Sequence, residues 1–184
     1  MGKLVLGLAT FMMCAWSQER ETHRIEVVAH ISNIEARDFV TVTGAQSYAS
    51  LLLEQAGVRL VWNKRCTTCE VINIRMDADA PLDVPAEALA YAMPFAKGLD
   101  YRIHIFRARL PRLQWVSPHI ILAYVLAHEI VHVLEGLDHH STHGIMKARW
   151  DYADYLEMEA CRFRFATEEL GWLRARNIVA QSGQ

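Results

Sequence analysis

The sequence lacks a strong excess of charge of either sign. Its 184 residues include 19 Lys and Arg against 21 Asp and Glu, and the formal net charge is -2 at pH 7. Proteins that bind nucleic acid gain most of their affinity from basic side chains placed on phosphates, and this balance supplies no such excess. We therefore expect no nucleic-acid partner.

The N-terminus has an apolar run, but it is short. Residues 4–13 are mostly apolar, follow the single basic residue Lys3 and precede Ala15-Trp16-Ser17. Roughly 18 or more apolar residues are needed to span a bilayer, so a stable membrane span is not expected from this run. A basic start, a short apolar segment and small residues are typical of a secretory signal peptide. We predict a signal peptide over residues 1–17 and a secreted or periplasmic protein.

Cysteine is scarce, and only one C-x-x-C pair is present. The chain has 4 cysteines, of which Cys66 and Cys69 form that pair. A second zinc knuckle would need another pair, and a thioredoxin-like pair would precede a helix, whereas residues 70–76 alternate like a strand. In an oxidising compartment the pair predicts a local disulfide. Cys161 is then expected to be a thiol packed in the core.

The length suffices for one domain with a sizeable core. No internal repeat, low-complexity tract or linker interrupts the chain, so we expect a single domain over residues 18–184. Alternating apolar residues predict strands over 24–31, 58–62, 71–76 and 100–106. Helical spacing and end signals predict helices over 47–55, 118–135, 152–165 and 167–176, with a short helix near 87–91.

The most informative segment is His128-Glu129-Ile130-Val131-His132. It falls in a predicted helix that starts after Ser117 and ends before Gly136, and whose apolar surface is wide enough for burial. Residues four apart lie on one helix face, so His128 and His132 can present two imidazoles to one ion. Glu129 is rotated by about 100° from His128, which leaves its carboxylate free to act on a water molecule beside a zinc ion.

A catalytic zinc site needs a third protein ligand. Three histidines follow the turn at Gly136, namely His139, His140 and His143. A glutamate of the next predicted helix, Glu157 or Glu159, is the alternative. The residues alone leave this choice open.

The run from His128 to Met146 resembles the zinc-binding core of metzincin-like secreted bacterial metallopeptidases. The residues that carry the resemblance are H-E-x-x-H at 128–132, a glycine at 136, and H-S-x-x-G-I-M at 140–146. The usual metzincin spacing would require glycine at 135 and histidine at 138, where this chain has Glu135 and Asp138. The resemblance implies His140 as third ligand, with His139 as the alternative, and a structural methionine turn formed by Gly144 and Met146.

The resemblance also implies a fold and an activity. The fold would be an α+β, zincin-like domain with a mixed β-sheet, a buried active-site helix and C-terminal helices. The activity would be that of a Zn²⁺ metalloendopeptidase with Glu129 as general base and a peptide or protein substrate. The strand at 101–106 would be either a sheet edge that pairs with the substrate or an interior strand, and Tyr152 or Tyr155 would lie near the metal or in the core. The alternatives are a zinc amidase or esterase on a non-peptide substrate, or an exported zinc-binding protein without activity.

Overall fold

The computed structural model describes residues 25–67, 69–94, 100–171 and 173. The predicted signal peptide at 1–17 lies outside the described residues.

Five strands form one mixed sheet in the order β2-β1-β3-β5-β4. They are β1 (Ile25–Ser32), β2 (Val58–Trp62), β3 (Glu70–Asp77), β4 (Ala90–Ala92) and β5 (Ile103–Phe106). The first, second, third and fifth strands pair in parallel, whereas β4 runs antiparallel to β5 at the edge. This sheet and its helices confirm the predicted fold class of mixed sheet with a buried helix.

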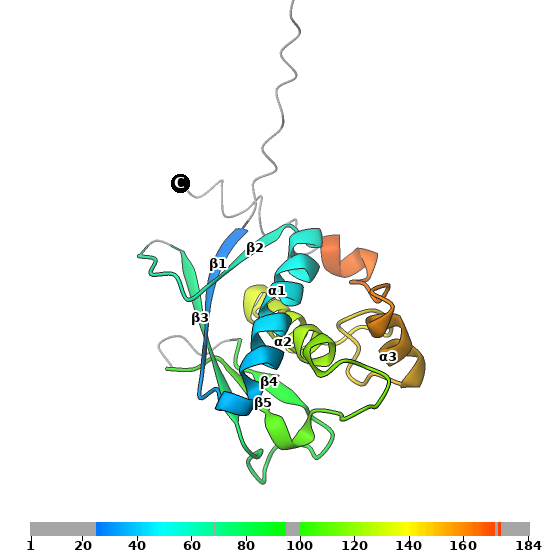
Figure 1. The fold of residues 1–184 in the computed structure, drawn as a ribbon. Helices are drawn as coiled ribbons and strands as arrows, with labels where there is room; N and C mark the ends of the chain where they lie inside the picture. Colours follow the sequence, from blue (N-terminus) through cyan, green and yellow to red (C-terminus); the bar gives the residue numbers. More distant parts are fainter. Residues whose placement is uncertain (1–24, 68, 95–99, 172, 174–184) are drawn as a thin grey trace, which may run out of the picture.

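Helices cover one face of the sheet. They are α1 (Phe39–Gln55), α2 (Pro118–Glu135) and α3 (Tyr152–Glu159). Figure 1 shows α1 and α2 on the same side of the sheet, with α3 beyond α2. Alternate residues of the strands supply the core, because successive side chains of a strand point to opposite faces. In β3 these are Ile72, Ile74 and Met76, all at most 2% exposed.

The helix that carries the histidine pair is the central element of the core. Every residue of α2 from Ile120 to Leu134 is buried. It is the one helix in the described part of the chain that is long and apolar enough to cross a membrane, and 83% of that stretch is buried inside the domain. A core helix passes the same length and composition test, so the domain itself accounts for its apolar character.

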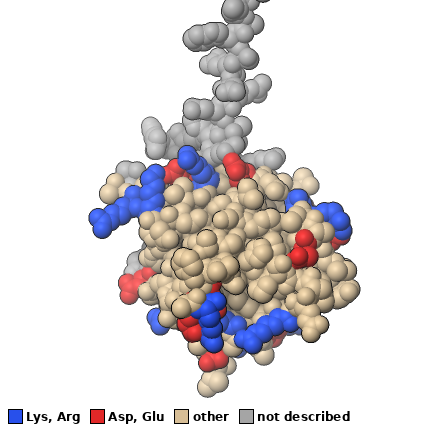
Figure 2. Space-filling model, viewed as in Figure 1, with Lys and Arg blue, Asp and Glu red and all other residues tan. Residues whose placement is uncertain are grey.

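Charged side chains of opposite sign lie close together. Figure 2 shows basic and acidic side chains interspersed near the margins of a broad uncharged face. Glu26, for example, lies 3.6 Å from Arg59 and 3.4 Å from Lys64. The face seen in Figure 2 therefore carries no dense patch of one sign.

Two helix predictions were wrong in extent and one in type. The helix expected over 47–55 begins at Phe39, and the helix expected over 152–165 ends at Glu159. The short helix predicted near 87–91 is absent, and residues 90–92 form β4 instead. Pairing with β5 determines the secondary structure of this segment, because the hydrogen bonds to a neighbouring strand outweigh the local propensity of three residues. Residues 167–171 are helical, and the predicted remainder to 176 falls largely outside the described residues.

The chain reverses where α3 ends. Cys161 adopts a φ of 55°, and the backbone N–H groups of Arg162 and Phe163 donate to the Glu157 carbonyl. This turn exposes Cys161, so its predicted place in the core was wrong. Cys66 and Cys69 are joined by a disulfide between β2 and β3.

The sheet edge nearest the histidine helix is β4. The strand predicted at 101–106 is β5, which lies between β3 and β4, so it is an interior strand. The alternative reading of 101–106 as a substrate-pairing edge was therefore wrong. The short antiparallel strand β4 takes the edge position, and it contacts α2.

Candidate metal centre

The two ends of α2 are held by different kinds of contact. Gly136 follows the helix with φ 67° and ψ 32°, the left-handed conformation predicted for it. Pro118 occupies the first turn, and Ser117 the N-cap position. The Ser117 side chain does not cap the helix, because its hydroxyl and backbone N–H both donate to the Glu159 carboxylate, at 3.3 and 2.8 Å. Helix α3 is thus tied to the start of α2.

The structure brings His128 and His132 together on one face of α2. His128 Nδ1 lies 2.9 Å from the Ile145 carbonyl, and His132 Nδ1 lies 3.0 Å from the Leu137 carbonyl. A carbonyl oxygen only accepts, so each Nδ1 carries a proton and each Nε2 holds a free lone pair when the ring is neutral. The two Nε2 atoms lie 3.0 Å apart. In a tetrahedral zinc site, nitrogen ligands lie about 3.3 Å from each other, so this pair is spaced for one ion.

His140 completes a group of three. Its ring centroid lies 5.3 Å from that of His128 and 4.9 Å from that of His132. One nitrogen of each of the three rings falls within 4.8 Å of the others. His128 and His132 are buried and His140 is exposed, so the group opens to solvent on the side of the loop.

The other sequence candidates lie elsewhere. His143 Nε2 is 3.3 Å from the Glu168 carboxylate on an exposed surface. Glu157 forms an ion pair with Arg162, and Glu159 accepts the two bonds from Ser117. His139 is half-buried and is not a member of the three-histidine group.

The turn after His140 is fixed against the C-terminal segment. Gly144 has φ 76°, and a Cβ there would lie 2.9 Å from both Ala166 N and Arg164 O. The Ile145 N–H donates to the Arg164 carbonyl at 3.1 Å, and the Ser141 N–H donates to the Met146 carbonyl at 2.9 Å. Met146 is 2% exposed and belongs to the core. The sequence predicted this turn, but the sequence alone did not show which segment lies behind it.

Glu129 lies beside the histidines and is 7% exposed. Burial raises its pKa to about 8. Burial also lowers the pKa of His128 to about 3 and of His132 to about 4, with the neighbouring histidines adding repulsion. All three shifts favour neutral groups, and a bound divalent cation reverses the effect on the carboxyl by favouring its ionised form.

A cavity of about 550 Å³ opens onto the three histidines. Its lining includes residues 87–92, which contain β4, and residues 147–150. Glu129 and Tyr155 line it. Tyr152 does not, because it is 65% exposed and packs against Trp115 with ring centroids 4.8 Å apart. Of the two tyrosines that the sequence left open, the structure places Tyr155 at the cavity.

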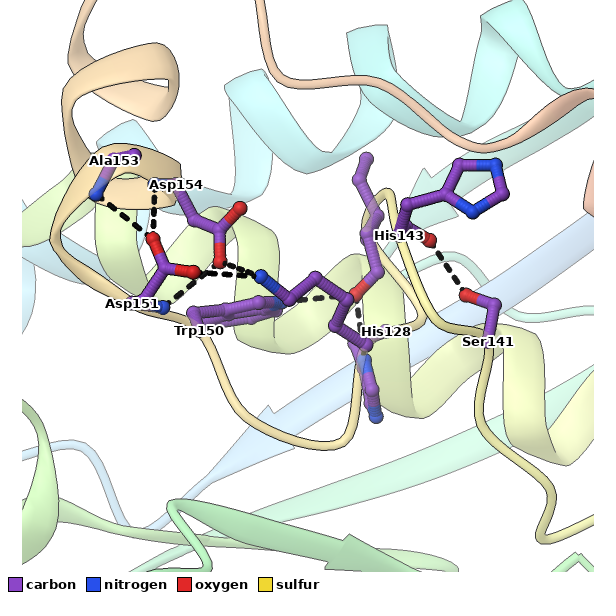
Figure 3. Close-up of polar contacts among 9 residues, drawn as sticks. His128, Ser141, His143, Trp150, Asp151, Ala153 and Asp154 are labelled. Atoms are coloured by element: carbon purple, nitrogen blue, oxygen red, sulfur yellow. Dashed lines mark hydrogen bonds and ion pairs between the residues drawn. The ribbon is translucent and has the colours of Figure 1, made fainter.

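Ion pairs compensate the basic groups of this wall. The Lys147 ammonium bonds to the carboxylates of Asp151 and Asp154, which also cap the start of α3 (Figure 3). Arg149 pairs with Glu87, and both residues line the cavity. Trp150, Tyr155 and Val125 are uncharged residues that line the same cavity as the histidines.

Comparison with known proteins gives a match at the level of structure. No family model matches the sequence, and no curated protein sequence matches it. The crystal structure of archaemetzincin from Methanopyrus kandleri matches with a TM-score of 0.50 and 15% sequence identity, covering 87% of this chain and 98% of that chain. The fold is zincin-like.

The residues at the site fit a zinc ion. Two lone pairs 3.0 Å apart in a buried setting repel each other unless a cation lies between them. Imidazole nitrogen is a preferred zinc ligand. His128 and His132 each donate a hydrogen bond from Nδ1 to a backbone carbonyl, as metal-bound histidines do. Sequence reasoning missed two residues, namely Trp150, which lines the cavity, and Glu169, a buried residue whose carboxylate accepts from the hydroxyl of Ser141, next to His140. A tryptophan or glutamate outside a motif carries no sequence signal that assigns it to a site.

Proposed function

We propose that this protein is a zinc-dependent peptidase. His128, His132 and His140 would hold the ion, and Glu129 would act as general base. The observation that carries this proposal is the convergence of three imidazoles, two of them with Nδ1 committed to carbonyls, beside a buried carboxyl. A structural zinc site would fill all four positions with protein ligands and would not need that carboxyl.

Zinc, when bound, supplies a Lewis acid that polarises a carbonyl and lowers the pKa of a water molecule. Glu129 accepts a proton from the attacking water and passes it to the leaving amine. Burial raises the pKa of the Tyr155 phenol, which stays protonated and can donate a hydrogen bond to the oxygen that gains charge. Glu129 is buried, which keeps its carboxyl away from bulk water, and Tyr155 is half-buried beside the cavity.

A peptide substrate suits the shape of the site. The edge strand β4 lines the cavity and is paired with β5 on one side only. An extended peptide can add to such an edge through backbone hydrogen bonds, with its side chains alternating between cavity and solvent. The name archaemetzincin, borne by a neighbour with the same fold, points to the same class of enzyme.

We further propose that the mature protein is a single domain over 18–184 that works outside the cytoplasm. The signal-like segment at 1–17 supports export. The disulfide between Cys66 and Cys69 supports it independently, since structural disulfides persist in oxidising compartments.

The test uses the full chain, its metal content and its turnover. Glu129→Gln is expected to retain zinc and to lower kcat/KM on a peptide library by about 10²- to 10⁴-fold. Purified protein that binds no transition metal overturns the proposal. Retained turnover in Glu129→Gln overturns the role of the carboxyl. Turnover of esters or amides but of no peptide in the library points to the non-peptide hydrolase instead.

The third ligand is tested by a matched pair of variants. His140→Ala is expected to lose most of its zinc, and His139→Ala, one residue away, is expected to keep it. Equal retention in the two variants would contradict the assignment of His140.

A further inference from the structure

One backbone carbonyl joins the histidine helix to the cavity wall. The Ile145 carbonyl accepts from His128 Nδ1 at 2.9 Å and from Trp150 Nε1 at 3.1 Å. A carbonyl oxygen has two lone pairs and can accept both. Figure 3 shows dashed lines from the Trp150 indole and the His128 ring meeting at this oxygen. The Ile145 side chain is fully buried, so no exposed loop carries this contact.

The Trp150 indole is itself held in place. Its ring lies edge-on to the His128 ring, with centroids 5.7 Å apart and an interplanar angle of 88°. Tyr124 and Phe163 pack against it at 6.5 and 6.4 Å. The next residue, Asp151, caps α3 and binds Lys147, which fixes the backbone on that side.

The two helix histidines differ in the kind of acceptor that orients them. His132 uses the Leu137 carbonyl, five residues away in the turn that ends the same helix. His128 uses a carbonyl 17 residues away, and the position of that carbonyl depends on tertiary contacts. The Trp150 indole is the side-chain donor that the structure assigns to it.

We propose that Trp150 is a positioning residue for His128. Its indole N–H holds the Ile145 carbonyl in the direction that accepts the Nδ1 proton of His128, which keeps Nε2 as the nitrogen that faces His132. The two hydrogen bonds to the Ile145 carbonyl are given by the structure, whereas their consequence for zinc affinity rests on the proposed function. Loss of the group that accepts from a metal-bound histidine typically lowers metal affinity by about 10- to 100-fold, and Trp150 orients that acceptor.

The test removes the donor and keeps the ring. Trp150→Phe and, as an isosteric second variant, 3-benzothienylalanine at position 150 both lack the indole N–H. Trp62→Phe is the matched control, because its indole N–H also donates to a backbone carbonyl, that of Gln46, far from the histidines in sequence and in a different contact. The readouts are the tautomer of each histidine in the metal-free protein by ¹⁵N NMR, and the zinc Kd by competition with a chelator.

The expected result is a mixture of His128 tautomers in both position-150 variants, an unchanged His132, and a zinc Kd raised by about 10-fold or more. Trp62→Phe should match the wild type in both readouts. A single Nδ1–H tautomer of His128 in the isosteric variant, or a zinc Kd equal to that of the wild type, overturns the proposal. If the position-150 variants show the tautomer change but the wild type binds no zinc, the contact is supported and the proposed function is refuted.

Discussion

Ser141 and Glu169 are joined by a short hydrogen bond of 2.5 Å between the hydroxyl and the carboxylate, across 28 residues of sequence. The second carboxylate oxygen of Glu169 accepts the Ala166 backbone N–H at 2.6 Å. Glu169 is 1% exposed. This buried carboxylate therefore ties the residue after His140 to the start of the C-terminal helical segment.

Ser141→Ala is expected to loosen the loop that carries His140. A hydrogen bond to a charged partner contributes about 1.5–3 kcal/mol, and its loss leaves one oxygen of Glu169 buried with fewer donors. We expect a lower free energy of unfolding by about that amount and weaker zinc binding. Chemical denaturation and chelator competition measure the two. Ser47→Ala, which removes an exposed hydroxyl bonded to the Thr43 carbonyl within α1, should change neither appreciably; equal effects in both variants would contradict the tie.

The two left-handed glycines of the site should respond differently to alanine. Gly136→Ala meets no atom within 4 Å, so it pays only the strain of its positive φ, about 1–2 kcal/mol. Gly144→Ala adds a clash with backbone atoms of Arg164 and Ala166 at 2.9 Å, and should destabilise the protein by more. Thermal unfolding of the two variants side by side measures the difference. A Gly144→Ala protein as stable as Gly136→Ala would mean that the turn does not pack on residues 164–166.

The chain stripped of metal should be most stable near pH 6.5. Below pH 6.5, the ordinary pKa of histidine, His128 and His132 bind protons in the unfolded chain but stay neutral in the folded one. The free energy of unfolding therefore falls as the pH drops. Between 4.5 and about 8, Glu129 binds a proton only in the fold, so its contribution falls as the pH rises. Below pH 6.5 the contribution of the two histidines to the pH dependence is larger than that of Glu129, so the free energy of unfolding rises with pH. Above pH 6.5 the contribution of Glu129 is the larger one, so the free energy of unfolding falls. Each uncompensated proton changes the free energy by up to about 1.4 kcal/mol per pH unit.

Glu129→Gln isolates the alkaline limb of that profile. The variant has no carboxyl to titrate, so the decline between pH 6.5 and 8 should disappear while the acid limb remains. Glu157→Gln removes an exposed carboxyl paired with Arg162 and should leave the alkaline decline in place. Urea unfolding in chelator at half-unit pH steps gives the profile. An unchanged alkaline limb in Glu129→Gln would show that this carboxyl is ionised in the fold.

Tyr155→Phe is expected to reduce turnover without loss of zinc. It removes a phenol that lines the cavity, and a donor to developing charge contributes about 10²- to 10³-fold in kcat. Tyr152→Phe is the matched control, since that ring is exposed and packs on Trp115. Kinetics with zinc content measured on the same samples separate the two. A change in KM with kcat unchanged, or an equal drop in kcat in Tyr152→Phe, would contradict a role of Tyr155 in the chemical step.

Periodicity and helix-end signals sufficed for the centre of the site. Pro118 and Gly136 at the ends of α2, and the four-residue spacing of His128 and His132, depend on helix geometry, which acts over one or two turns. Strands β1, β2, β3 and β5 follow from alternation for the same reason, and the fold class was confirmed by the sheet. The predicted start of α1 and the predicted end of α3 were wrong because the sequence carries no strong capping signal at either position, and tertiary packing sets both ends.

Local pattern alone determined that two imidazoles and a carboxyl share one stretch of buried helix. Tertiary structure decided which loop histidine approaches them, that β4 and not β5 forms the sheet edge, and that Trp150 and Glu169 brace the turn. The contacts of His128 with Ile145, of Ser141 with Glu169 and of Ser117 with Glu159 join residues 17, 28 and 42 positions apart. Their free energy comes from packing and hydrogen bonds formed only when these segments meet. Short-range propensity cannot select among such partners, whereas in the folded domain His128 Nδ1 meets the Ile145 carbonyl and the Ser141 hydroxyl meets Glu169.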